Sequence, residues 1–408
     1  MDYSVYPSEK RSFKSYRLRG EYPQPWLKER QRNYTLRSNL IVYAFFFTSL
    51  CISAYLCYDG YRKVKRRDYC LILDDSFESI DPSIWQREQQ LDGYEVGSFD
   101  WTTPDDSNAY ASPNGLVIMP TLTNLTTSIT PSDIIDGYRL NLTTQGVCTS
   151  DRIASCAVLS NSTTGEIINP VRSARLTTKF SKAIQYGRVE VVAKMPKGDW
   201  LLPSIRMIPV NETYGDWPQS GSVDIVLARG NQAGYPAGGR NIFTSTLHWG
   251  VSRAANRFWK TTFGRRVRRT DYTKGYNTFG LEWTKDYLFT YHNGRTYSVL
   301  WIGFLKESLW DLGQFSNNGS LQANPWSVSE NMNAPFDQPF YLSLSLQVGA
   351  TNYAVFPDSH DKPWIDASPR ATAEFWSAVD SWYPTWGTGE DRALTVRNVK
   401  MWQEGKCN

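Results

Sequence analysis

The sequence predicts an all-β sandwich preceded by one membrane-spanning helix. Apolar and polar residues alternate along 188–195 and 340–348 with the two-residue period of a strand. Asn293-Gly294 lies between two β-rich runs in 287–301, where it supplies the positive φ angles of a tight hairpin turn. No long segment carries the 3.6-residue apolar stripe of an amphipathic helix, which favours a sandwich over an α/β fold.

The chain begins with a basic tail. Residues 1–39 hold nine Lys/Arg and four Asp/Glu, so this tail has a net charge of +5 within a chain of net charge +4. We interpret it as a disordered cytoplasmic tail; contact with an anionic cytoplasmic membrane face is the alternative.

Residues 40–58 form an uncharged run of 19 residues, long enough to span a bilayer. The run begins too far from Met1 for an ordinary signal peptide and has no small-residue cleavage pattern behind it. We therefore predict an uncleaved signal anchor, with a buried core helix as the alternative, followed by a basic juxtamembrane linker over 59–67. Basic residues flank the run on both sides, so the positive-inside rule leaves its orientation open.

Glycosylation acceptors indicate the orientation. One Asn-x-Ser/Thr sequon, at Asn33, precedes the apolar run, and the others follow it. These are Asn124, Asn141, Asn161, Asn211 and Asn318. Their grouping predicts a single-pass type II membrane protein whose main domain, 68–408, is lumenal or extracellular, at the plasma membrane or in the secretory pathway. Nucleic acid is not an expected partner for such a domain.

The cysteines agree with an oxidising compartment. Cys51 and Cys57 fall in the anchor, and the four others allow three disulfide pairings. We favour Cys148 with Cys156 as a local staple and Cys70 with Cys407 as a tie between the ends of the domain. No Cys/His spacing suggests a metal site, and no cofactor is predicted.

The segment 217–231 has the layout of a glycosidase active-site strand. Residues two apart on a strand share a face, so Ser222 and Asp224 point the same way, and one extra residue at a bulge would bring Leu227 round to join them. A retaining glycosidase needs two carboxyl groups roughly 5 Å apart. Because Ser222 and Leu227 carry no carboxylate, only Asp224 remains.

Several stretches in the same order along the chain resemble glycoside hydrolase family 16, in its branch of β-1,3-glucanases and β-1,3-glucan recognition (Gram-negative-bacteria-binding-like) proteins. They are 168–175, 186–191, 194–200, 217–231, 245–250, 279–283, 334–338 and 399–403. The resemblance implies a concanavalin-like jelly roll over 68–408. It also implies that Ser222 replaces the nucleophile, that Asp224 is the remnant helper acid, and that Leu227 replaces the acid/base.

The same resemblance suggests which residues contact sugar. Leu202 and Arg206 stand where that branch usually carries further tryptophans, so the aromatic platform is reduced. The residues expected in the sugar site are Trp200, Arg206, Trp217, His248 and Trp249.

The sequence thus predicts a membrane-anchored β-1,3-glucan-binding protein that is a catalytically inactive family 16 homologue. One alternative is an active hydrolase or transglycosylase on β-glucan that recruits a carboxylate from elsewhere. Another is a scaffold that has lost sugar binding and recognises a protein partner that the sequence does not identify. The basic stretch 253–269 is interpreted as a solvated loop, or as a contact for acidic polysaccharide or lipid head groups.

Overall fold

The structure is a computed structural model that describes residues 14–17, 19–21, 23, 25, 32–63, 67–315, 323–352, 354–358 and 361–407. The predicted sequon at Asn318 and much of the predicted tail lie outside these residues. The chain divides into two compact units, Met1–Arg66 and Arg67–Asn408.

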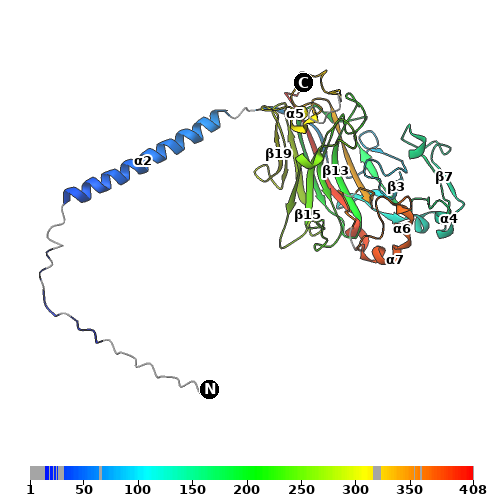
Figure 1. Cartoon of the computed structure of the whole chain (residues 1–408), viewed down its shortest axis with the longest axis horizontal. Coiled ribbons are helices and arrows are strands. Elements are labelled where there is room, and N and C mark those ends of the chain that lie inside the picture. Colours follow the sequence, from blue (N-terminus) through cyan, green and yellow to red (C-terminus); the bar gives the residue numbers. More distant parts are fainter. Residues whose placement is uncertain are drawn as a thin grey trace, which may run out of the picture. The chain divides into compact units, whose positions relative to one another are not determined.

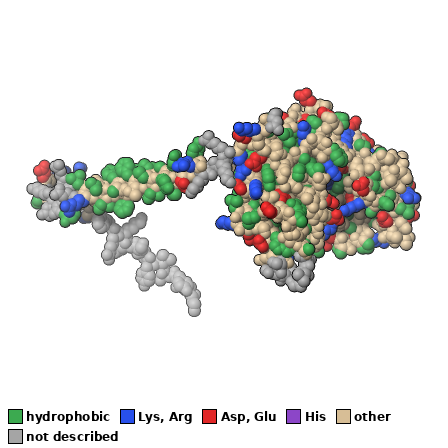
Figure 2. Space-filling model, turned by 90° about the horizontal axis from the view of Figure 1, so that it is seen from above, with side chains coloured by type: hydrophobic (Ala, Val, Ile, Leu, Met, Phe, Trp, Pro, Cys, Tyr) green, Lys and Arg blue, Asp and Glu red, His purple; other side chains and the backbone are tan. Residues whose placement is uncertain are grey.

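In the first unit the described residues include one long helix, α2 (Arg32–Lys63). Its stretch Tyr34–Arg62 is long and apolar enough to cross a membrane. The side chains seen along its middle are almost all hydrophobic, and Lys and Arg lie toward its ends (Figure 2). The helix is consistent with a single anchor, and it extends beyond both ends of the predicted run 40–58.

The second unit is a β-sandwich of two eight-stranded sheets (Figure 1). Sheet A has the order β19 (Ser298–Gly303), β18 (Tyr287–His292), β17 (Asn277–Trp283), β12 (Gly187–Lys194), β21 (Leu394–Glu404), β5 (Gly115–Ile118), β4 (Ala109–Ser112), with β1 (Tyr69–Asp75) beside β21. Sheet B has the order β16 (Thr262–Arg266), β15 (Ile242–His248), β14 (Ser222–Ala228), β13 (Leu201–Pro209), β20 (Phe340–Val348), β10 (Arg175–Thr177), β2 (Gln86–Arg87), with β11 (Ala183–Ile184) beside β20.

Smaller elements gather at the side of this unit away from β19 (Figure 1). They include β3 (Asp100–Thr102), β6 (Thr121–Leu122), β9 (Val171–Ser173), the pair β7 (Arg139–Asn141) and β8 (Ala157–Leu159), and the helices α4 (Pro131–Ile135), α6 (Ala371–Ser377) and α7 (Val379–Trp382). The helices α3 (Thr123–Thr126) and α5 (Leu309–Gly313) are short turns of the loops.

The strand patterns of the sequence are confirmed. In β12 every second residue is buried, and in β20 Leu342, Leu344 and Leu346 are fully buried in the core between the sheets. The predicted hairpin is formed by β18 and β19, and Asn293 in its turn has a φ of 59°. The polar residues on the opposite face of β20, Ser343, Ser345 and Gln347, are buried as well, so this strand is covered on both faces.

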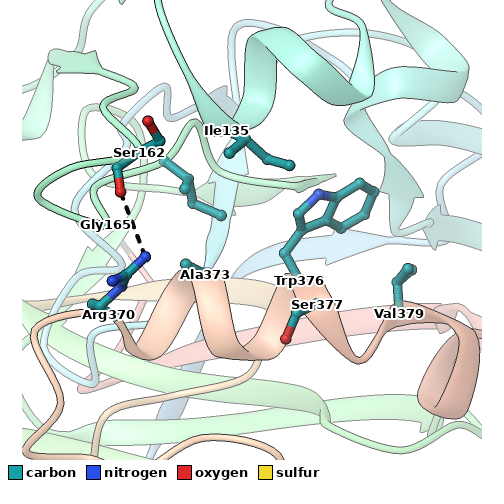
Figure 3. Close-up of a pocket in the computed structure, with 9 residues that line it drawn as sticks. Ile135, Ser162, Gly165, Arg370, Ala373, Trp376, Ser377 and Val379 are labelled. Atoms are coloured by element: carbon teal, nitrogen blue, oxygen red, sulfur yellow. Dashed lines mark hydrogen bonds between the residues drawn. The ribbon is translucent and has the colours of Figure 1, made fainter.

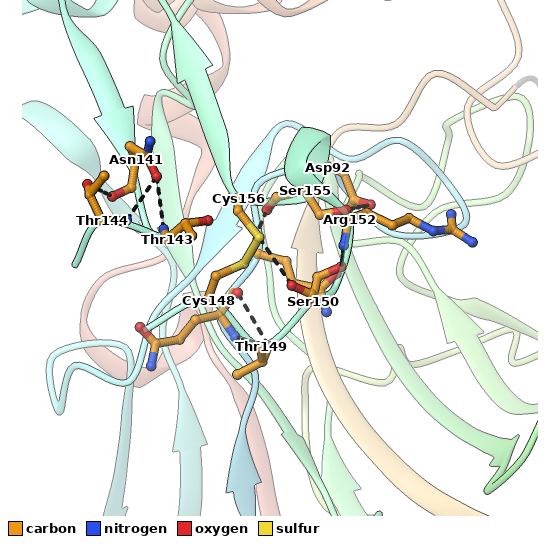
Figure 4. Close-up of a disulfide and its surroundings, with 12 residues drawn as sticks. Asp92, Asn141, Thr143, Thr144, Cys148, Thr149, Ser150, Arg152, Ser155 and Cys156 are labelled. Carbon is orange, nitrogen blue, oxygen red and sulfur yellow. Dashed lines mark hydrogen bonds between the residues drawn. A yellow bond between two sulfur atoms is a disulfide. The ribbon is translucent and has the colours of Figure 1, made fainter. Parts of the chain in front are cut away.

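Both predicted disulfides are present. Cys70 and Cys407 join the two ends of the sandwich, with a Cα–Cα distance of 4.9 Å. Cys148 and Cys156 close a short loop next to β7 and β8, with a Cα–Cα distance of 5.7 Å (Figure 4). The Cys70–Cys407 disulfide, which links the two ends of this unit, stabilises the folded state because it reduces the conformational entropy of the unfolded chain.

Candidate functional site

The segment predicted as an active-site strand forms β14, between β13 and β15 of sheet B. Ser222 lies opposite His248, and Asp224 lies opposite both Arg206 and Thr246. The register of β14 then shifts against both neighbours before Leu227, which is the bulge that the spacing predicted. Because of this extra residue, Leu227 shares a face of the sheet with Ser222 and Asp224.

Asp224 is a fully buried carboxylate with both oxygens engaged. Arg206 Nε donates to Oδ1, and His248 Nε2 lies 2.9 Å from Oδ2. Asn256 Nδ2 lies 3.2 Å from the other ring nitrogen of His248, an arrangement in which Nε2 carries the hydrogen that Asp224 accepts. Burial by itself would raise the pKa of Asp224, but the charge of Arg206 and the hydrogen bonds from Arg206 and His248 lower this pKa to about 2.

A second carboxylate, which the sequence analysis did not identify, lies beside this group. Glu95 Oε2 accepts a hydrogen bond of 2.9 Å from Arg206 Nη1 and lies 3.9 Å from Arg175 Nη1. Burial opposes ionisation of Glu95, but Arg206 and Arg175 hold the pKa of this carboxyl below its usual range. Arg175 in turn pairs with Glu88 at 2.9 Å. Charges of alternating sign therefore run over sheet B from Arg175 on β10 to Asp224 on β14.

Glu95 and Glu88 escaped sequence reasoning because they lie in the connection between β2 and β3, far from the motif strands along the chain. Arg175 belongs to one of the stretches that carried the family resemblance, 168–175, which gave it no role. One feature of the sequence could have indicated such a partner. Arg206 occupies a position where the family usually has tryptophan, and a buried arginine requires a buried acidic side chain beside it.

Trp217 and His248 form the partly exposed end of the site. Trp217 Nε1 donates to Ser222 Oγ at 3.0 Å, and the centroids of the Trp217 and His248 rings are 5.5 Å apart. The guanidinium of Arg253 lies 5.3 Å from the centre of the Trp217 ring. This arrangement offers an aromatic surface bordered by hydrogen-bonding groups, which suits a sugar ring.

The structure places Trp200 and Trp249 away from this group. Trp249 comes directly after His248, the last residue of β15, so the two side chains point to opposite faces of the sheet. Trp249 is fully buried in the core, and its Nε1 donates to Thr261 Oγ1. Trp200 is 4% exposed and packs edge-on against Trp364 at 4.9 Å. Of the expected sugar-contacting residues, Arg206 and His248 contact Asp224, and Trp217 contacts His248. The two buried tryptophans present no ring face to solvent.

These contacts limit the chemistry of the site. A glycosidase acid must hold a proton at neutral pH, which requires a raised pKa, whereas the pKa values of Asp224 and Glu95 are both lowered. Both carboxylates also contact the same guanidinium. Among the described residues no group of three or more His, Cys, Asp or Glu side chains could hold a metal ion.

A separate cavity of about 330 Å³ lies between the end of α4 and helices α6 and α7 (Figure 3). Ile135, Ile167 and Trp376 form its apolar wall, and Arg370, which donates to the Ser162 carbonyl, lies at its polar side. None of the residues around Asp224 lines it.

Comparison with curated proteins found clear relatives, although no family model matches. The chain is 37% identical over 344 residues to the β-1,3-glucan-binding protein of Penaeus monodon, covering 82% of this chain and 90% of that protein. It is 29% identical over 342 residues to Gram-negative bacteria-binding protein 1 of Drosophila melanogaster, covering 81% of this chain and 64% of that one. The chain thus spans less than two thirds of the Drosophila protein.

Solved structures share the fold. The catalytic domain of an endo-1,3-β-glucanase (laminarinase) from Thermotoga petrophila superposes with a TM-score of 0.51 at 18% identity, over 84% of this chain and 100% of that domain. The endo-β-1,3-glucanase from Pyrococcus furiosus gives a TM-score of 0.51 at 18% identity, over 84% and 97% of the two chains.

Proposed function

This chain belongs to the family of β-1,3-glucan-binding proteins, and we propose that it binds β-1,3-glucan without cleaving it. The observation that carries the proposal is the pairing of Arg206 with Asp224, next to Ser222 and Leu227. The remnant acid is neutralised by a guanidinium, and the two flanking positions carry no carboxylate. Binding of sugar is assigned to the partly exposed group of Trp217, His248 and Arg253.

The membrane topology is part of the same proposal. Residues 40–58, in the central part of helix α2, are an uncleaved type II anchor between a cytoplasmic tail over 1–39 and a basic juxtamembrane linker over 59–67. The glycan-binding domain, 68–408, then lies in the lumen or outside the cell. The four described sequons of this domain support that side of the membrane.

Two of these acceptors have a suitable local geometry for N-glycosylation. Asn141 Oδ1 accepts from the backbone N–H of Thr143, and Asn161 Oδ1 accepts from that of Thr163, both at 2.9 Å. Each asparagine side chain is thus oriented toward the hydroxyl residue of its own sequon. Asn124, Asn211 and Asn318 are the remaining proposed acceptors.

The test is a calorimetric titration of the full glycosylated chain, purified in detergent, with a linear β-1,3-gluco-oligosaccharide, followed by chromatography of the sugar. We expect saturable binding and intact sugar. Trp217→Ala should weaken binding about tenfold, which corresponds to about 1.4 kcal/mol. The control is Trp301→Ala, which removes an exposed tryptophan of β19 in the other sheet and should leave the affinity unchanged.

Two results would contradict the proposal. Shortened sugar products that disappear in Asp224→Ala would identify an active glycosidase. The absence of binding heat with every glucan tested would favour the scaffold alternative, which the full burial of Asp224 and near-full burial of Ser222 and Arg206 also favour.

A further inference from the structure

One connection covers part of the polar face of sheet B. Residues 88–99, which we call the strap, join β2 to β3. The strap contacts sheet B through side chains: the guanidinium of Arg175 on β10 lies 4.0 Å from the Tyr94 ring centre, and Glu95 pairs with Arg206 on β13. The strap therefore lies over β10 and β13, and over β20, which runs between them in the sheet.

The strap is held at both of its ends. Phe99 N donates to the Val348 carbonyl at 2.8 Å, and Glu88 pairs with Arg175 at 2.9 Å. Its middle is folded tightly, since a Cβ on Gly93, which has a φ of 67°, would lie 2.2 Å from the backbone N of Ser98. Val96 is buried in the main core. The strap is thus a packed part of the domain.

Burial across sheet B follows the position of the strap. The polar side chains Ser204, Arg206, Ser343, Ser345 and Gln347 are only 2–5% exposed. On the opposite side of Asp224, Thr246 is still only 4% exposed, but Leu227, Thr244, His248 and Thr262 are partly exposed, and Arg266 on the edge strand β16 is exposed. The face is therefore closed on the β13 side and at the centre of β14, and it becomes partly accessible at both ends of β15 and on β16.

We propose that the site takes the end of a glucan chain, which enters over β16 and stops at the Glu95–Arg206 pair. This inference rests on the proposed glucan binding and adds the part of the polymer that is bound. A glucan passing across all of sheet B would have to displace the strap and separate Glu95 from two buried arginines, which is strongly unfavourable. Glu95 is therefore the residue that determines specificity for chain ends over chain interiors.

The test compares two linear β-1,3-glucans of long and short chain length at equal mass, titrated calorimetrically into the full chain in detergent. If chain ends are bound, a tenfold reduction in chain length should give about a tenfold increase in binding sites per gram. Sites per gram that do not change with chain length would overturn the inference while leaving glucan binding intact. Absence of binding to both samples would overturn both proposals.

A variant tests the role of Glu95 directly. Glu95→Ala removes the side chain that closes the β13 side, so sites per gram of the long glucan should rise several-fold. The matched control is Asp92→Asn in the same strap, whose carboxylate accepts from Ser155 rather than facing Arg206. If a folded Glu95→Ala protein bound the same number of sites per gram of long glucan as the natural protein, Glu95 would not determine specificity for chain ends. The comparison of long and short glucans with the natural protein decides the proposal independently of this variant.

Discussion

Arg206 lies directly opposite Asp224 on the paired strands β13 and β14, and its guanidinium donates to both Asp224 and Glu95. One side chain thus holds both Asp224 of the motif strand and Glu95 of the strap. The contacts that lower the pKa values of these two carboxyl groups also fasten the strap over one side of the site.

We predict that Arg206→Met destabilises the domain by about 3–5 kcal/mol, because it leaves the buried carboxylates Asp224 and Glu95 without their shared partner. Urea unfolding followed by tryptophan fluorescence measures this. The control is Arg266→Met, at an exposed position, for which the expected change is within about 0.5 kcal/mol. Equal effects of the two substitutions would show that the buried ion pairs are not important for stability.

The depressed pKa of Asp224 predicts a loss of stability in acid. The folded state holds this carboxylate ionised down to a pKa of about 2, whereas in the unfolded chain it titrates near its ordinary value of 3.8. The unfolded state therefore binds more protons in this interval, and stability falls as the pH falls from about 4 toward 2. The stabilisation by ionised Asp224 is of order 2 kcal/mol.

Comparison with Asp224→Asn isolates this contribution. The difference in unfolding free energy between the natural protein and the variant should be largest above pH 5 and should shrink as the pH is lowered to 3. A difference that stays constant with pH would mean that the pKa of Asp224 is not lowered in the folded state.

Asp100 predicts the opposite dependence on pH. Burial raises the pKa of this carboxyl to about 6, against the opposing effect of a hydrogen bond from Val348 N at 2.7 Å. The folded state binds more protons than the unfolded state between pH 4 and 6, so ionisation of Asp100 lowers stability as the pH rises, by roughly 3 kcal/mol. Asp100→Asn should consequently be more stable than the natural protein at pH 7.

Asp105→Asn provides the control for that measurement. Hydrogen bonding from the Ser107 backbone N–H and pairing with Arg172 lower the pKa of Asp105, so its substitution should reduce stability above pH 4. Unfolding curves of both variants at pH 4 and pH 7 distinguish the two signs. The prediction for Asp100 fails if the stability of Asp100→Asn relative to the natural protein does not increase from pH 4 to pH 7.

The two disulfides should contribute unequally to stability. Cys70 and Cys407 are 337 residues apart in sequence, whereas Cys148 and Cys156 are 8 apart. In the chain-entropy account, the longer closed loop restricts the unfolded state by about 6 kcal/mol and the shorter by about 2.5 kcal/mol. Paired Cys→Ser variants measured by thermal unfolding test the order, and a larger loss from the Cys148/Cys156 variant would contradict it.

Local patterns in the sequence were sufficient for much of this protein. Alternation predicted β12 and β20, Asn293-Gly294 predicted the β18–β19 hairpin, and the two-residue spacing with a bulge put Ser222, Asp224 and Leu227 on one face. The apolar run predicted a helix long and apolar enough to cross a membrane. These features depend on residues close together in the chain, where backbone geometry relates spacing to direction.

Only the tertiary structure decided what surrounds Asp224. Glu95 is 111 residues from Arg206 in sequence, and no local pattern marks it as the partner of that guanidinium. The burial of Trp200 and Trp249 likewise depends on which side of each strand faces the second layer and its covering loops. The sequence by itself indicated the family and the strands, and it shows that Ser222 and Leu227 of the motif strand carry no carboxylate. The path of the strap over sheet B decided how much of the site is accessible, because long-range packing and charge pairing arise only when the whole domain is assembled.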